Sequence, residues 1–97
     1  MTDDFTQSPE FQALIKEYLE YLKGLLPEVR EKLADSSYDD VYKYAHNIKG
    51  TGTSYGFVEL TGLGAEICQE IKAENYALLS EKLDSIEALL DSELETR

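Results

Sequence analysis

The segment "AHNIKGTGTSYG", from Ala45 to Gly56, contains the only histidine of the chain, His46. A neutral imidazole is a good nucleophile near neutral pH, because an unperturbed histidine titrates near pH ~6.5. A ring nitrogen can accept a phosphoryl group, and the new negative charge then needs a nearby cation and no nearby carboxylate. Lys49, and less directly Lys43, supply the cation. None of the 20 Asp and Glu residues lies between Val41 and Val58, so this segment is free of carboxylates.

Glycines surround this histidine although each interior helical glycine costs about 0.5–1 kcal/mol relative to alanine. Gly50 lies one turn beyond His46 on the same helix face, where the missing side chain leaves a flat approach to the imidazole open. Gly52 faces inward and lets a neighbouring helix come close. Gly56 suits the end of the helix, where a left-handed residue is common. The tolerated cost indicates an exposed imidazole with cleared space in front of it.

The helical phase around His46 predicts that its side chain points outward. At about 100° per residue, the apolar side chains gather on one broad face, made of Val41, Tyr44, Ala45, Ile48, Gly52 and Tyr55. His46 lies nearly opposite that face. Its own face carries Asp39, Tyr42, Lys43, Lys49, Gly50 and Thr53.

A long apolar repeat from Phe11 to Leu33 predicts the first helix of the scaffold. Ser8 is a good N-cap, and Pro9 suits the first helical position. Gly24 and Pro27 interrupt the repeat, because an interior proline removes a hydrogen bond and clashes with the preceding turn. We therefore expect a kinked helix or two short helices, and the unbroken apolar phase across Pro27 favours the kink.

Three further amphipathic segments follow, over about residues 38–54, 57–74 and 76–93. Ser37 and Asp40 imitate a capping box before the first of them, and Asn75 marks a tight turn before the last. The inward positions of the last two segments are Phe57, Leu60, Leu63, Ile67 and Ile71, then Leu78, Leu79, Leu83, Ile86, Leu89 and Leu90. No alternation typical of strands occurs. The pattern predicts an all-α, antiparallel four-helix bundle with a kinked or split N-terminal helix.

Length and composition favour one small domain over residues 1–97, with residues 1–7 as a flexible terminus. The net charge of −11 argues against nucleic acid and anionic membrane surfaces as partners. No apolar run approaches the roughly 20 residues of a membrane span, and the acidic start is not a secretory signal. We therefore expect a cytoplasmic monomer. A single cysteine, Cys68, excludes an internal disulfide, and together with one histidine it makes no zinc site.

Other catalytic chemistries lack the residues that they need. Di-metal sites in bundles use Glu-x-x-His pairs from two helices, whereas this chain has one histidine with Lys43 three residues before it. Nothing indicates partners for a Ser-His-Asp triad. The Gly-x-Gly spacing at Gly50 and Gly52 lacks the preceding strand of a nucleotide-binding loop. We therefore expect no cofactor, no ATP site and no enzymatic activity of the chain's own.

The stretch "AHNIKGTGTSYGFVELTGL" resembles the histidine-containing phosphotransfer (HPt) domains of multistep phosphorelays. The resemblance rests on the spacing of His46, Lys49, Gly50, Gly56, Leu60 and Leu63. Two positions depart from the family pattern. Cys68 stands where relatives often have an acid, and Thr53 follows Gly52 where many relatives have the glycine one place later. These departures concern partner docking more than the phosphorylated histidine.

The resemblance implies a four-helix phosphoryl carrier without ATPase activity. His46 would accept a phosphoryl group from an aspartate of one receiver domain and pass it to an aspartate of another. Lys49 would stabilise the phosphoryl oxygens, and Gly50 would leave room for the partner. The partners would be response-regulator receivers, which bring the Mg²⁺ ion, and a hybrid sensor kinase. Docking candidates around His46 are Tyr42, Thr53 and, on the outer face of the third helix, Gly64 and Cys68.

Two alternative functions remain open at the level of sequence. The domain could be the histidine substrate of a chemotaxis-type kinase, phosphorylated by a separate ATP-binding domain. It could also be a helical adaptor that is never phosphorylated, although an adaptor has no reason to keep Lys49 and Gly50. A kinase dimerisation helix is disfavoured, because an acid usually follows the histidine there and Asn47 follows His46 here.

Overall fold

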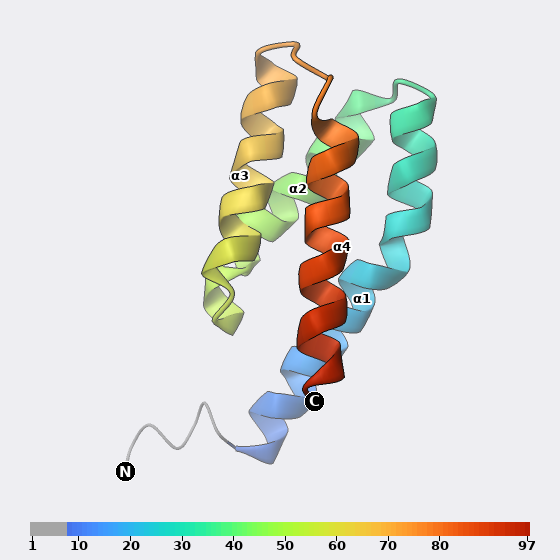
Figure 1. The fold of residues 1–97 in the computed structure, drawn as a ribbon. Coiled ribbons are helices and arrows are strands. Elements are labelled where there is room, and N and C mark those ends of the chain that lie inside the picture. The colour runs from blue at the N-terminus through green and yellow to red at the C-terminus, as the bar shows by residue number, and fades with distance from the viewer. Residues whose placement is uncertain (1–7) are drawn as a thin grey trace.

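The structure, a computed structural model, describes residues 8–97 and is all-α over that range. Figure 1 shows a bundle in which successive helices run in opposite directions, as predicted. None of its helices is both long and apolar enough to cross a bilayer. The predicted flexible terminus, residues 1–7, lies outside the described range. The elements are α1 (Pro9–Ala34), α2 (Tyr38–Thr51), the 3-10 helix η2 (Thr53–Tyr55), α3 (Val58–Lys72) and α4 (Leu79–Glu95).

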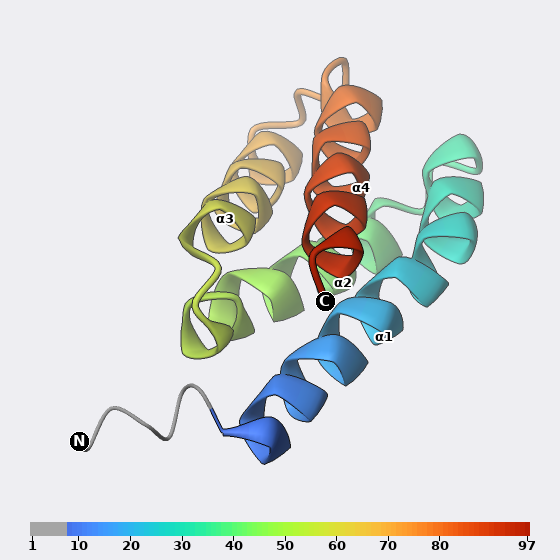
Figure 2. The ribbon, with the colours of Figure 1, turned by 60° about the horizontal axis from the view of Figure 1, so that its bottom comes forward.

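Helix α1 begins with the predicted cap and continues through its proline. The Phe11 amide donates to the Ser8 hydroxyl oxygen at 3.1 Å, and Pro9 occupies the first turn. α1 is one continuous helix that contains Pro27, so the split alternative is wrong. Its axis changes direction about halfway along (Figure 2), which agrees with the predicted kink.

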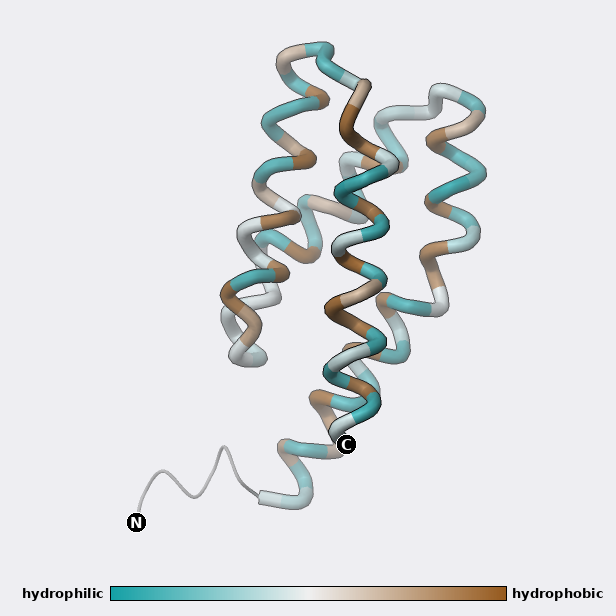
Figure 3. Tube along the Cα trace, viewed as in Figure 1, coloured by the Kyte–Doolittle hydropathy of each residue, from teal (hydrophilic) through white to brown (hydrophobic). Residues whose placement is uncertain are grey.

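The core runs the length of the bundle between the four helices. Its largest fully buried side chains are Leu19, Leu22, Leu26, Val41, Ile48, Leu60, Ile67, Leu79, Leu83, Ile86 and Leu90. Hydrophobic positions recur along each helix at the spacing of its turns (Figure 3), and within residues 8–97 no polar or charged residue is buried with them. Burial of about 1.5–3 kcal/mol per large apolar side chain fixes the rotation of every helix about its axis.

Several predicted helix ends are wrong in detail. The helix expected to reach Ser54 ends at Thr51 and continues as η2, which closes at Gly56 in the left-handed region (φ 90°), as predicted for that glycine. Ser37 stands before α2, but its side chain makes no capping hydrogen bond. The left-handed residue after α3 is Glu74 (φ 58°), which precedes the asparagine expected to mark the turn.

The start of the last helix also differs from the prediction. α4 begins at Leu79 and not at Tyr76, and it ends at Glu95. Leu78, predicted to be buried, therefore precedes the helix and is 41% exposed. Because Leu78 lies outside the helix, the helical repeat of α4 does not predict the direction of its side chain.

Candidate functional site

His46 is exposed in the middle of α2, on the side of the helix away from the core. The buried residues Val41, Ala45 and Ile48, each with 0% exposure, lock the opposite side of α2 inward. The predicted outward phase of the imidazole is therefore confirmed. The imidazole is therefore open to a reactant that approaches from solvent.

Three lysines of α2 and α3, Lys43, Lys49 and Lys72, carry charges that no carboxylate of residues 8–97 pairs with. All three are exposed. The ion pairs of this range instead engage Lys23, Arg30, Lys32, Lys82 and Arg97. In a chain with 20 acidic residues, this leaves the lysines of the His46 region available to an incoming anion.

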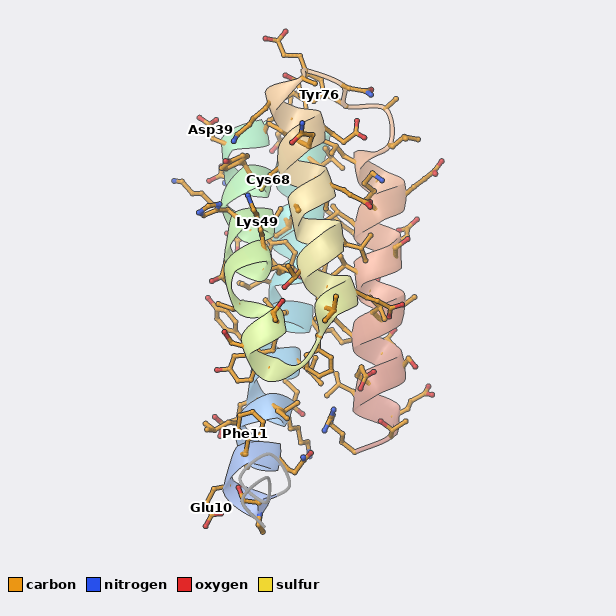
Figure 4. All side chains as sticks on the ribbon, turned by 90° about the vertical axis from the view of Figure 1, so that its left-hand side faces the viewer. Glu10, Phe11, Asp39, Lys49, Cys68 and Tyr76 are labelled. Atoms are coloured by element: carbon orange, nitrogen blue, oxygen red, sulfur yellow. The ribbon has the colours of Figure 1, made fainter. Side chains whose placement is uncertain are left out.

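The two predicted phosphoryl-binding lysines lie on different sides of α2. Lys49 lies on the α3 side with Cys68, since its charge acts on that thiol, and Figure 4 shows the two residues close together on that face. Lys43 lines a groove of about 250 Å³ between α1 and α2, together with Tyr21 and Asp40. Lys49 thus lies on the side of α2 that packs against α3, and Lys43 on the side that faces α1.

Cys68 does not lie on the outer face of α3, where the sequence placed it. It is 3% exposed, and burial raises the pKa of its thiol, partly offset by the charges of Lys49 and Lys72 and by the nearby Tyr42 side chain. The hydrophobic repeat of α3 assigned this small residue to solvent, but α3 buries a second side against α2. Cys68 thus packs under Tyr42 between α2 and α3 and is not part of a docking surface.

Gly64 is also buried, so its predicted place on the docking surface is wrong. A Cβ atom there would stand 2.6 Å from the Ala45 carbonyl oxygen and 2.8 Å from the Lys49 amide nitrogen. Gly64 therefore sets the distance between α3 and the part of α2 that carries His46. Gly52 makes a similar close approach, as predicted, with a Cβ position 2.9 Å from the Thr61 amide nitrogen.

Gly50 differs from Gly52 and Gly64 because the packing of the bundle does not require a glycine at its position. It is exposed, has helical conformation, and would meet no atom within 4 Å if it carried a Cβ. An alanine there would favour the helix. If a glycine is required at this position, the reason is therefore a partner molecule and not the packing of the bundle.

Of the four predicted docking residues, only Thr53 is exposed, and it lies just after the end of α2. Its amide donates to the Thr61 hydroxyl oxygen at 2.8 Å, and the two hydroxyls are 3.0 Å apart. These bonds fasten η2 to α3. Thr53 remains exposed beside the turn that follows Gly50.

Tyr42 lies against the imidazole. Its ring and that of His46 are stacked, with centroids 5.7 Å apart and planes 10° apart. The Lys72 ammonium lies over the same Tyr42 ring, 5.9 Å from its centroid. The sequence did not single out Lys72, because the acid-free window ends well before it. Its spacing of four residues from Cys68, on one face of α3, was the available signal.

Comparison with known protein families identifies the family of the chain. The Hpt domain family model matches residues 13–96, which includes all four helices except the first turn of α1. Neither the curated proteins nor the solved structures give a match. Among the residues of the structure, no cluster of histidine, cysteine and acidic side chains could hold a metal ion. The chain belongs to the Hpt domain family, whose members carry phosphoryl groups on histidine in two-component signalling and interact with receiver domains.

Proposed function

We propose that the chain is a phosphorelay intermediate that takes a phosphoryl group from a receiver aspartate onto His46 and passes it to another receiver aspartate. The observation that carries the proposal is the exposure of the chain's only histidine on the helix that carries Lys43 and Lys49, which no carboxylate of residues 8–97 neutralises. A histidine phosphocarrier with one histidine has no other residue to use. A monomer that works in the cytoplasm is part of the proposal.

The transfer step needs alignment and charge neutralisation more than covalent help from the bundle. A ring nitrogen of His46 attacks the phosphorus of the aspartyl phosphate, the N–P bond forms, and the bond from phosphorus to the carboxyl oxygen breaks. The receiver regains a free carboxylate, and the reverse exchange loads the next receiver. We propose that Lys49 stabilises the phosphoryl oxygens, with Lys43 contributing at longer range.

The receiver would approach over the open surface beside the imidazole. The empty Cβ position of Gly50 leaves space for its phosphorylated loop, and Thr53 offers an exposed hydroxyl at the rim. We expect the receiver to bring the Mg²⁺ ion and the acidic pocket that hold the phosphoryl group before transfer. A hybrid sensor kinase that contains such a receiver is the expected donor.

One experiment separates this role from that of a kinase substrate. The purified chain is incubated either with a panel of phosphorylated receivers and Mg²⁺ or with a chemotaxis-type kinase domain and labelled ATP. We expect the receivers to label the chain reversibly, and His46→Gln to remain unlabelled. Labelling by the kinase alone would mean a kinase substrate, and labelling by neither would mean an adaptor; either result would overturn the relay.

A further inference from the structure

We propose that Tyr42 is a positioning residue that holds the His46 imidazole in its reactive orientation by ring stacking. The inference rests on the proposed function of His46 as the phosphorylated residue. It also changes the expected role of Tyr42, which the sequence suggested only as part of a docking surface.

The helix itself brings the two rings together. Tyr42 and His46 are four residues apart, so they are neighbours on the surface of α2. Their planes are within 10° of parallel and their centroids are 5.7 Å apart, which is an offset-stacked arrangement. An exposed imidazole otherwise samples several rotamers. Contact with a fixed aromatic face restricts it to few.

Tyr42 can restrict His46 because α3 holds Tyr42 in turn. Its side chain is half-buried and packs against the core. The buried residue Cys68 of α3 lies beside Tyr42, which lowers the pKa of its thiol. The Lys72 ammonium lies 5.9 Å from the ring centroid, within the range of a cation–π contact. The orientation of the imidazole is thus set from α3 through Tyr42.

Orientation matters in this reaction because a ring nitrogen must reach the phosphorus in line with the bond that breaks. An imidazole already in place pays no rotational cost when the receiver docks. Since an aromatic pair of this kind contributes about 0.5–1.5 kcal/mol, loss of the stack should slow transfer by about two- to tenfold. Affinity for the receiver should not change, because the stack acts within one chain.

The test compares Tyr42→Leu, Tyr42→Phe and the control Tyr38→Leu. Tyr38 belongs to the same helix, two turns before His46, and stacks on Tyr76 at 3.7 Å without touching the imidazole. Single-turnover transfer from a phosphorylated receiver is measured over a range of receiver concentrations. The maximal rate reports the orientation of the imidazole, and the half-saturating concentration reports docking. Proton NMR of His46 adds the ring-current shift that a stacked tyrosine causes.

We expect Tyr42→Leu to lower the maximal rate two- to tenfold with an unchanged half-saturating concentration, and to abolish the ring-current shift. Tyr42→Phe keeps the ring and should restore both, and Tyr38→Leu should match the wild type. A raised half-saturating concentration at an unchanged maximal rate would make Tyr42 a docking residue and overturn the inference. So would a wild-type spectrum without the shift, which needs no variant. If wild-type His46 accepts no phosphate, the proposed function fails instead.

Discussion

Gly64 of α3 lies so close to α2 that a Cβ atom on it would stand 2.6 Å from the carbonyl oxygen of Ala45, the residue before His46. The backbones of the two helices therefore lie against each other next to His46. This contact lets α3 place Cys68 and Lys72 against Tyr42. Residues of both α2 and α3 thus form the surface around His46, although only α2 carries the histidine.

Gly64→Ala should destabilise the bundle, because α3 must move away from α2 to admit the methyl group. We expect a loss of about 1–3 kcal/mol in the free energy of unfolding, typical of overpacking, measured by urea denaturation. Gly62→Ala is the matched control on the same helix, since its Cβ would meet nothing within 4 Å. It should stabilise the chain by about 0.5–1 kcal/mol. Equal effects of the two substitutions would argue against the close approach.

Gly50→Ala should affect stability and transfer in opposite directions. The space beside Gly50 is empty, so alanine should raise the free energy of unfolding by about 0.5–1 kcal/mol. The same methyl group should slow transfer from a receiver, and Gly50→Gln should slow it further. Gly24→Ala in α1, also without neighbours, should stabilise without slowing transfer. Unimpaired transfer by Gly50→Gln would show that no partner approaches over this position.

Removal of the Lys49 charge should slow phosphoryl transfer without unfolding the bundle. Lys49 is exposed and pairs with no carboxylate of the described chain, so Lys49→Gln should change the melting temperature little. We expect the transfer rate to fall about ten- to hundredfold, as when a preorganised charge partner of a transition state is lost. Lys43→Gln, on the groove side, should have a smaller effect. Equal rates for Lys49→Gln and the wild type would remove Lys49 from the site.

High pH should destabilise the chain through Tyr44. Burial raises the pKa of Tyr44 above its ordinary value of 10.0, so the folded chain keeps a proton that the unfolded chain releases. The free energy of unfolding should therefore fall as the pH rises above about 10. Tyr44→Phe should flatten this fall, but it should cost about 1 kcal/mol at pH 7, because the hydroxyl donates to the Leu22 carbonyl at 2.8 Å. Urea denaturation of the wild type and of Tyr44→Phe, at pH 7 and at a pH above about 10, measures both effects. An identical pH dependence of the free energy of unfolding in the two proteins would contradict the prediction.

The outward orientation of His46 was predictable because strongly apolar residues fix the phase of α2. Val41, Ala45 and Ile48 leave only one way for that helix to face the core. The same reasoning failed on α3, where small residues make the contact with α2. Gly64 and Cys68 contribute little to a hydrophobic repeat, so their burial depends on how closely two helices approach, which a single helical pattern does not contain.

The surroundings of the imidazole were harder to predict than its position. The stacking of Tyr42 on His46 follows from spacing within one helix, and the sequence had placed both on one face. The contribution of Lys72 comes from a different helix and depends on the α2–α3 packing. The exposure of Leu78 likewise depends on where α4 begins, and no capping side chain marks that start.

The most direct test of the account is the chemical identity and position of the phosphate after incubation with a phosphorylated receiver and Mg²⁺. Phosphorus NMR, combined with acid and base treatment and peptide mapping, identifies the modified residue. The account predicts one acid-labile, base-stable phosphate on His46, which leaves the chain when an unphosphorylated receiver is added. A stable phosphate on a serine, threonine or tyrosine, or the same labelling in His46→Gln, would contradict it.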